Sequence, residues 1–286
     1  MWHDADRVRD QPTASIKLKR VPTAAATQIR AFYRTLFRAW GRQHWWPAQS
    51  RFEVIAGAYL TQNTAWSNVE RALSALRQAG VLSLKGIRAT PLPRLERLIR
   101  PAGYFRQKAR RLKTFVEFLD ARYGGSLDRM FARPTAALRE QLLELNGVGP
   151  ETADSILLYA GQHAVFVVDA YTRRILARHG VLPENAPYEE IRARFEQALV
   201  TPHFLHQCES QSLATDHRPL TTPQGSCHPP SRMSTARRTP PAQVFNQMHG
   251  LIIGVGKNYC FKSKPLCEQC PLGRWLPADS ARTEKI

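Results

Sequence analysis

Residues 147–150 combine two glycines with a proline, in an order that is typical of a tight turn leading into a helix. Gly147 and Gly149 flank Val148, and glycines let the backbone turn tightly and approach another molecule with no side chain in between. The proline that follows suits the first position of a helix, where its missing N–H costs nothing. Free amides at a helix start bind anions. The residues expected to hold a phosphate are Gly147, Val148, Gly149 and Thr152.

A single carboxylate follows an apolar run in the same part of the chain. Residues 164–168 are apolar and are comfortable only when buried, and Asp169 comes next, at the position of a helix N-cap. Capping a helix, and nothing more, is the commoner role of such an aspartate. A phosphate site and a carboxylate at a buried edge within one short segment nevertheless indicate chemistry on a nucleic acid.

The composition agrees with a polyanionic partner. The chain has 286 residues, with 41 lysines and arginines against 23 aspartates and glutamates, which gives a net charge of +18. An excess of this size favours binding to DNA over a basic surface that only aids solubility. No stretch is long and apolar enough to span a bilayer, and residues 1–20 lack the apolar core of a signal peptide. We therefore expect a cytoplasmic, nucleoid-associated protein with no membrane partner.

The elements that must position these residues are helices. From about residue 27 onward, apolar residues recur every three or four positions, as in the face formed by Ile29, Phe32 and Leu36. The one strong β-branched run, 165–168, is too short to make a sheet and is more simply a buried connector. The sequence therefore predicts an all-α fold with short turns between helices.

Two regions lack the helical pattern. Residues 1–27 form a basic segment, for which we expect a disordered tail. Residues 201–242 are rich in Pro, Ser, Thr, His and Gln and have almost no apolar periodicity. Because a loop of this length inside a compact domain normally signals disorder, we expect a disordered insertion there.

The glycine turn, Asp169 and a cysteine-bearing loop near the C-terminus together resemble the helix-hairpin-helix DNA glycosylases of the endonuclease III superfamily. The resemblance covers about residues 28–200 and 243–272. It implies two helical domains that flank a DNA-binding cleft, with a helix-hairpin-helix motif and a C-terminal cysteine loop. The implied parts are a six-helix domain over 51–164 and a split domain over 28–50, 165–200 and 243–286.

The resemblance gives roles to two carboxylates. It implies that Asp169 is the catalytic residue, since an ionised carboxylate stabilises the oxocarbenium-like sugar as the base departs and orients or deprotonates a water. Members that also cut the backbone carry a lysine at the position of Glu151, where it forms a Schiff base with the sugar. A carboxylate cannot form that imine, so we expect a monofunctional glycosylase. Favourable placement against the helix dipole is the alternative role of Glu151.

Aromatic residues and an amide form a candidate base pocket. A base flipped out of the duplex needs flat aromatic walls and hydrogen-bond partners, and Trp45, Trp46 and Trp66 accompany Gln62. The arrangement resembles the endonuclease III-like 3-methyladenine DNA glycosylases, whose aromatic pocket holds alkylated purines; the resemblance implies that Gln62 fills the gap left by the base. Tryptophans are more often core residues. Since two consecutive tryptophans cannot both face inward on one helix, we expect Trp45 or Trp46 to be available.

Three cysteines near the C-terminus have a metal-ligand spacing. Cys260, Cys267 and Cys270 follow C-x6-C-x2-C, which the superfamily's [4Fe–4S] loop continues with x5-C. Here the fourth position is Leu276. Cytoplasmic cysteines are reduced, so metal ligation is a better interpretation than disulfides. Three possibilities stay open: a cluster with a non-cysteine or borrowed fourth ligand, a zinc site, or a loop without metal.

The leading prediction is a monofunctional glycosylase that acts as a monomer on double-stranded DNA. It hydrolyses the N-glycosidic bond of a damaged base, which we expect to be an alkylated purine. The alternative enzyme is an endonuclease III-type glycosylase and AP lyase for oxidised pyrimidines, with another lysine as nucleophile. A helix-hairpin-helix protein that only grips DNA is the alternative without catalysis.

Overall fold

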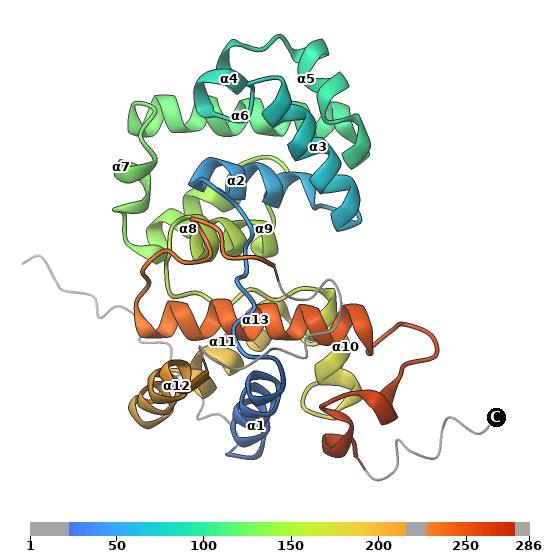
Figure 1. Cartoon of the computed structure of the whole chain (residues 1–286). Coiled ribbons are helices and arrows are strands. Elements are labelled where there is room, and N and C mark those ends of the chain that lie inside the picture. Colours follow the sequence, from blue (N-terminus) through green and yellow to red (C-terminus); the bar gives the residue numbers. More distant parts are fainter. Residues whose placement is uncertain (1–22, 216–227, 278–286) are drawn as a thin grey trace, which may run out of the picture.

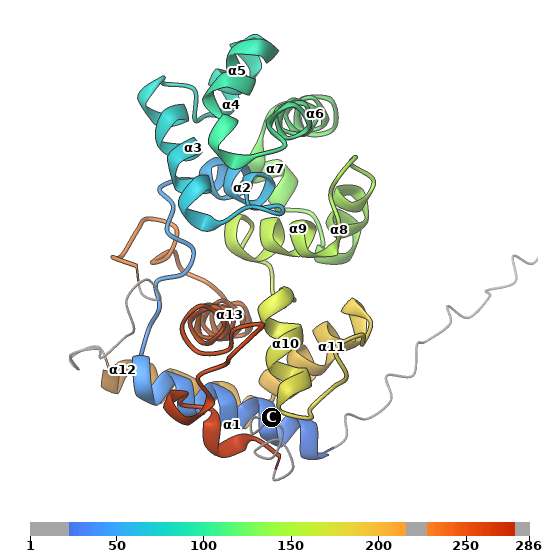
Figure 2. The same ribbon diagram turned by 90° about the vertical axis from the view of Figure 1, so that its right-hand side faces the viewer.

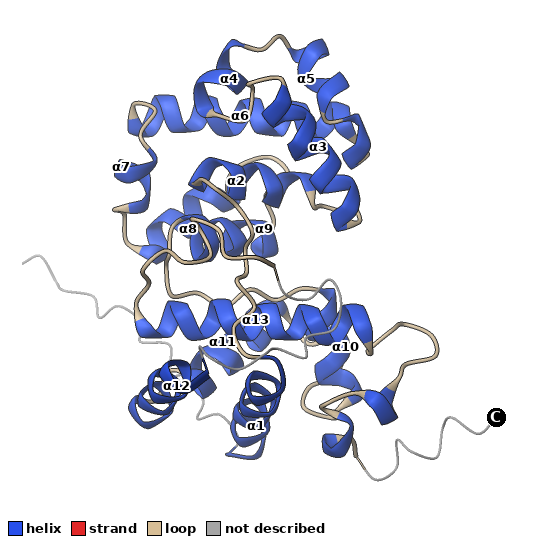
Figure 3. Cartoon of the chain, viewed as in Figure 1, coloured by secondary structure: helices blue, strands red, loops and turns tan. Residues whose placement is uncertain are grey.

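A computed structural model describes residues 23–215 and 228–277 of the chain (Figure 1). The α-helices are α1 (Thr23–Trp40), α2 (Arg51–Leu60), α3 (Trp66–Gln78), α4 (Leu84–Ala89), α5 (Leu92–Leu98), α6 (Phe105–Tyr123), α7 (Leu127–Phe131), α8 (Thr135–Leu143), α9 (Pro150–Ser155), α10 (Ala170–Arg178), α11 (Tyr188–Leu199), α12 (Pro202–Thr215) and α13 (Pro240–Asn258). Shorter helical segments are η1 (Arg100–Ala102), the π-helical η2 (Ile156–Ala160), η3 (Cys267–Gln269) and η4 (Gly273–Trp275). Within these ranges there is no strand, so the all-α prediction is confirmed (Figure 3).

The helices form two lobes, which lie one above the other in both views (Figures 1 and 2). Helices α2 to α9 make one lobe, and α1 with α10 to α13 makes the other. Each lobe has a central helix that is buried on every side: residues 52–60 of α2 and residues 244–256 of α13 are all buried. A helix that is buried on every side is stable only inside a protein, so these two helices organise the lobes. No helix in the described ranges is long and apolar enough to cross a membrane.

The two predictions of disorder are wrong in part. Helix α1 begins at Thr23, so the last residues of the predicted 1–27 tail are helical. The first part of the predicted 201–242 insertion forms α12, whose Phe204 is buried with its ring 5.4 Å from that of Tyr33 on α1. Few apolar residues are enough for α12 because it packs against helix α1, which is itself held in the fold. The remaining parts of these predictions, residues 1–22 and 216–227, lie outside the described residues.

The later part of the predicted insertion, residues 228–239, packs on the loop formed by residues 41–50. The Met233 N–H donates to the Ala48 carbonyl at 3.0 Å, and the Ser231 hydroxyl accepts the Ala48 N–H at 3.2 Å. Both Met233 and Ser231 are buried. The segment is thus held by hydrogen bonds to a distant loop, which leave no periodic pattern in the sequence.

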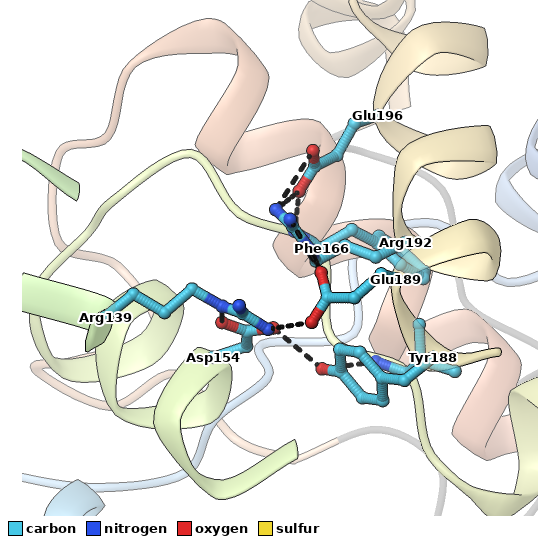
Figure 4. Close-up of polar contacts among 8 residues, drawn as sticks. Arg139, Asp154, Phe166, Tyr188, Glu189, Arg192 and Glu196 are labelled. Carbon is cyan, nitrogen blue, oxygen red and sulfur yellow. Dashed lines mark hydrogen bonds and ion pairs between the residues drawn. The ribbon is translucent and has the colours of Figure 1, made fainter. Parts of the chain in front are cut away.

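A buried ion-pair network joins the two lobes (Figure 4). Asp154 on α9 is fully buried and accepts hydrogen bonds from Arg139 on α8 at 2.7 and 3.1 Å. Arg139 also contacts Glu189 on α11 at 2.6 Å. The Tyr188 hydroxyl of the same helix donates to Asp154 at 2.9 Å and accepts the Val168 N–H at 3.3 Å. The network therefore fixes the backbone immediately before α10.

Candidate active site

A cavity of about 610 Å³ lies between the two lobes. Its size falls in the range of about 300–1,000 Å³ that is usual for small-molecule sites. The candidate site residues that line it are Trp45, Trp46, Gln62, Trp66, Gly147, Glu151, Thr152 and Asp169. Two residues of the predicted phosphate turn do not line this cavity: Val148, which is buried, and Gly149, which is exposed. Segments from both lobes thus meet around one space.

The two glycines of the turn differ in what the protein requires of them. Gly147 has φ 77°, and an added Cβ would lie 2.0 Å from Arg111 Nε. Gly149 is the N-cap of α9 with φ −91°, and an added Cβ would meet nothing within 4 Å. The positive φ therefore favours a glycine at position 147, while the Arg111 side chain could shift to make room for a Cβ. At position 149 the open face is available to another molecule, and Pro150 occupies the first helical position as the sequence predicts.

Asp169 caps α10 and is held by three contacts. Its Oδ1 accepts hydrogen bonds from the Thr172 backbone N–H at 2.7 Å and the Thr172 hydroxyl at 2.8 Å. His249 Nε2 lies 3.5 Å from Asp169 Oδ2. Burial by itself raises the pKa of Asp169, but His249 and Thr172 outweigh it, and the pKa lies below its usual value. The carboxylate is therefore ionised at neutral pH.

His249 is a site residue that the sequence analysis missed. It lies in the middle of α13, is buried, and its Nδ1 forms a hydrogen bond with the Tyr159 hydroxyl. Tyr159 belongs to η2, which directly follows α9, so this pair connects the two lobes. A polar residue inside an apolar helix needs a buried partner. A histidine within an apolar stretch could therefore have been recognised in the sequence as a residue with a buried partner, but the sequence does not identify that partner.

Glu151 opens into the same cavity from the first turn of α9. Glu151 is exposed, although its carboxyl group loses part of its water to the surrounding protein. This loss of water, and next the Asp169 charge, raise the pKa of Glu151 to about 7. One carboxyl group is thus ionised while its neighbour can hold a proton near neutral pH.

Gln62 is bound to the glycine turn. Its side-chain nitrogen donates to the Gly147 carbonyl at 2.8 Å and to the Thr152 hydroxyl at 2.9 Å. Its side-chain oxygen accepts a hydrogen bond from Arg111 at 2.7 Å. Both ends of the amide therefore have protein partners. Filling a gap in DNA, as the resemblance implies for Gln62, would require these hydrogen bonds to break.

The three tryptophans form one wall of the cavity. Trp45 and Trp46 are 5% and 4% exposed, so the expectation that one of them stays free is wrong. That expectation assumed a helix, whereas both residues lie in the loop between α1 and α2. Trp66 is half-buried, and its ring centre lies 5.7 Å from that of Trp45 and 5.2 Å from that of Trp46. A base that stacks between two rings needs a contact of about 3.5 Å on each of its faces, so the two rings would have to stand about 7 Å apart. These rings are closer than that, and they therefore do not form two facing walls around a base.

Lys257 also lines the cavity, although the sequence analysis did not place it there. It lies near the end of α13, with its Nζ 6.0 Å from the centre of the Trp45 ring. Burial lowers the pKa of Lys257, and Glu70 opposes this effect. Glu70 also accepts a hydrogen bond from Trp66 Nε1 at 2.8 Å. The amine thus belongs to the tryptophan side of the cavity.

Comparison with known sequences identifies the family. Residues 56–200 match the family described as HhH-GPD superfamily base excision DNA repair protein. The chain belongs to this superfamily. A Methanocaldococcus jannaschii protein, whose name gives it as an inferred DNA repair glycosylase, is 38% identical over 245 residues, or 85% of this chain and 93% of that protein. Endonuclease III of Thermotoga maritima is 25% identical over 219 residues, or 77% of this chain and 79% of that protein.

Solved structures agree with this membership. The 3-methyladenine DNA glycosylase of H. pylori, bound to 1,N6-ethenoadenine, superimposes with a TM-score of 0.61 at 27% identity, over 82% of this chain and 97% of that one. An endonuclease III trapped as a covalent intermediate with DNA has a TM-score of 0.64 at 20% identity, over 90% and 98%. The HhH-GPD protein described here is therefore a DNA glycosylase of base excision repair.

The cysteine loop of this HhH-GPD protein lies at the other end of α10. Cys260, Cys267, Cys270 and Leu276 line one pocket. Burial raises the pKa of the Cys270 thiol to about 11, and the nearby Cys260 and Cys267 thiols add to the rise. Arg178 donates a hydrogen bond to Cys260 Sγ at 2.9 Å. Three thiols thus share a pocket with a cation beside one of them.

The spacing of these thiols bears on the metal that they could hold. In the described part of the chain, no three His, Cys, Asp or Glu side chains are grouped closely enough to hold a metal ion. Zinc binds each sulfur at about 2.3 Å, which requires sulfurs about 4 Å apart. The thiolates of a [4Fe–4S] cluster bind different irons and stand farther apart. Of the four ligand positions in the superfamily's cluster motif, three are cysteines in this pocket and the fourth is Leu276.

Proposed function

We propose that this protein is a monofunctional DNA glycosylase that removes alkylated purines from double-stranded DNA as a monomer. The observation that carries the proposal is the pair of carboxyl groups, Asp169 and Glu151, in a cavity walled by tryptophans. Glu151 stands where members with lyase activity have their lysine. Support for the substrate comes from the 3-methyladenine DNA glycosylase that superimposes on this chain at 27% identity.

Asp169 acts on the sugar and on the water. Its ionised carboxylate stabilises the positive charge that develops at C1′ as the bond to the base breaks and the electron pair leaves with the base. A cationic alkylated purine departs as a neutral base, so it needs no added proton. Water then forms the new bond to C1′ and gives up one proton, which Asp169 accepts and passes to solvent.

The tryptophan wall favours a cationic purine. Stacking on an aromatic ring contributes about 1–3 kcal/mol per base. A positively charged base gains further from the negative face of the ring. Trp45, Trp46 and Trp66 line the cavity together with the Asp169 and Glu151 carboxyl groups, which also attract a cation, whereas the Lys257 amine in the same cavity opposes it.

One observation favours AP lyase activity as a second candidate. The Lys257 amine lies in the cavity with a lowered pKa, which increases the fraction that is neutral and nucleophilic. Against this, the amine lies beside the Trp45 ring, where a flipped base would stack. We therefore favour contact between Lys257 and the base over attack on the sugar.

Excision from a panel of duplexes, with borohydride added in parallel, tests the proposal. The panel contains 7-methylguanine, 1,N6-ethenoadenine, thymine glycol and an abasic site. We expect release of the alkylated purines and no covalent adduct. An adduct that disappears in Lys257→Ala would contradict the monofunctional assignment. Release of the oxidised pyrimidine in place of the purines would contradict the substrate assignment.

A further inference from the structure

The cysteine pocket contains one more side chain with metal-ligand chemistry. His179, the C-cap residue of α10, lines the same pocket as the three cysteines. It is only 5% exposed, and among the described residues its Nδ1 has no hydrogen-bond partner. Buried polar atoms without a partner are rare, and each one calls for an explanation such as an ion.

The other ring nitrogen determines the tautomer of His179. The imidazole is hydrogen-bonded to the backbone carbonyl of Trp275. Because Nδ1 has no partner, Nε2 is the ring nitrogen available to this carbonyl, and a proton on Nε2 is the tautomer that would donate to it. Nδ1 therefore keeps its lone pair. Histidines that bind metals usually donate their other N–H to a carbonyl or carboxylate in this way.

The hydrogen bond also ties the ring to the place where a ligand is missing. Trp275 immediately precedes Leu276, the position of the absent fourth cysteine. Gln28 on α1 donates to the His179 carbonyl at 3.3 Å and to the Trp275 carbonyl at 3.4 Å. The Phe32 ring packs edge-on against the imidazole, with ring centres 5.0 Å apart. Helix α1 thus holds the histidine against the end of the cysteine loop.

We propose that His179 Nδ1 is the fourth protein ligand of a [4Fe–4S] cluster whose other ligands are Cys260, Cys267 and Cys270. Each thiol loses its proton on binding, whereas the neutral imidazole binds iron through its lone pair and loses none. Arg178, which already donates to Cys260 Sγ at 2.9 Å, offsets part of the negative charge. Histidine in place of cysteine is an established variation of iron–sulfur centres, and it raises the reduction potential.

Iron and sulfide content of the anaerobically purified protein tests the proposal directly. We expect brown wild-type protein with about four irons per chain. His179→Ala should lose more than half of the iron. His179→Cys should keep it with a lower reduction potential, because a thiolate adds negative charge. The matched control is His163→Ala, because both ring nitrogens of this half-buried histidine are satisfied by Thr135 and the Phe131 carbonyl. It should retain the wild-type iron content.

Two further measurements cover a variant that fails to fold. His179→Ala combined with Leu276→Cys restores four cysteines and should regain the cluster. Pulsed EPR of reduced wild-type protein labelled with ¹⁵N-histidine should show coupling to a histidine nitrogen, which is lost in His179→Cys. A folded His179→Ala with full iron and an unchanged potential would overturn the proposal, as would zinc or no metal in the wild type. These readouts do not depend on base excision, so they stand if the proposed substrate is wrong.

Discussion

The two ends of helix α10 carry sites of opposite character. At the N-terminal end, the Asp169 carboxylate is satisfied by Thr172 and faces His249 at 3.5 Å. At the C-terminal end, the Nδ1 of His179 has no hydrogen-bond partner among the described residues. A buried polar group whose hydrogen bonds are all made within the protein keeps its geometry without a ligand. A buried polar group without a hydrogen-bond partner lowers the stability of the protein until a ligand supplies that partner. The Asp169 carboxylate is therefore in place before DNA binds, although the Nε1 atoms of Trp45 and Trp46 in the same cavity have no hydrogen-bond partner among the described residues.

Removing the charge of Asp169, at the N-terminal end of α10, should have the largest effect on base excision. Asp169→Asn keeps an effective N-cap, since asparagine caps helices as well as aspartate does, but it cannot stabilise the sugar cation. We expect single-turnover excision to fall by about 10²–10⁴-fold. Duplex affinity and the melting temperature are the controls and should stay close to wild type. Excision within tenfold of wild type would remove Asp169 from the chemistry.

Removing His249, which faces the Asp169 carboxylate, should have a smaller effect on base excision, and the size of this effect should depend on pH. In the wild type, His249 helps to hold the pKa of Asp169 below its usual value. His249→Gln removes this help, so the pKa rises and the carboxylate becomes protonated at higher pH. We expect the acidic limb of the pH–rate profile to move up by about one unit, which costs about tenfold in rate on that limb. Above pH 8 the rates should converge, and a profile that falls equally at every pH would indicate that His249 is only structural.

Loosening the backbone that leads into α10 should mainly affect stability. Tyr188→Phe removes the acceptor of the Val168 N–H and one donor to the buried Asp154. We expect the free energy of unfolding in urea to fall by about 1–3 kcal/mol, the cost of buried polar groups that lose a partner. Tyr104→Phe is the matched control, because Tyr104 is 68% exposed. Equal stability of the two variants would show that the network does not support the site.

The smallest effect should come from replacing Glu151, and it should appear in the pH dependence of stability. Its pKa in the folded protein is about 7, above the ordinary value of 4.5, so between these values the native state holds more protons than the unfolded chain. The stability of the wild type therefore falls as pH rises through this window. Glu151→Gln removes the titrating group and should flatten that decline. The readout is the difference in melting temperature between pH 5 and pH 8, and identical differences for both proteins would contradict the raised pKa.

Local patterns in the sequence were sufficient for one end of α10. The glycine turn, the proline at the start of α9 and the cap at Asp169 depend on residues a few positions apart, so their types and spacing predict them. The replacement of a lysine by Glu151 is also readable without a structure. Helical periodicity was enough for the all-α fold, because each helix must bury one face.

Long-range contacts decided the rest. Tyr159 and His249 form a hydrogen bond although they are 90 positions apart in the sequence. No residue close to either of them in the sequence predicts this contact. The burial of Trp45 and Trp46 follows from a loop that residues 228–239 hold in place, although that segment has no periodic pattern of its own. His179 joins the cysteine pocket only because α10 ends beside Trp275. The sequence by itself determined the helices, the caps and the carboxylate expected to act on the sugar, since these need only near neighbours. The tertiary structure alone decided which side chains complete each site, because burial and hydrogen-bond satisfaction depend on residues that folding brings together.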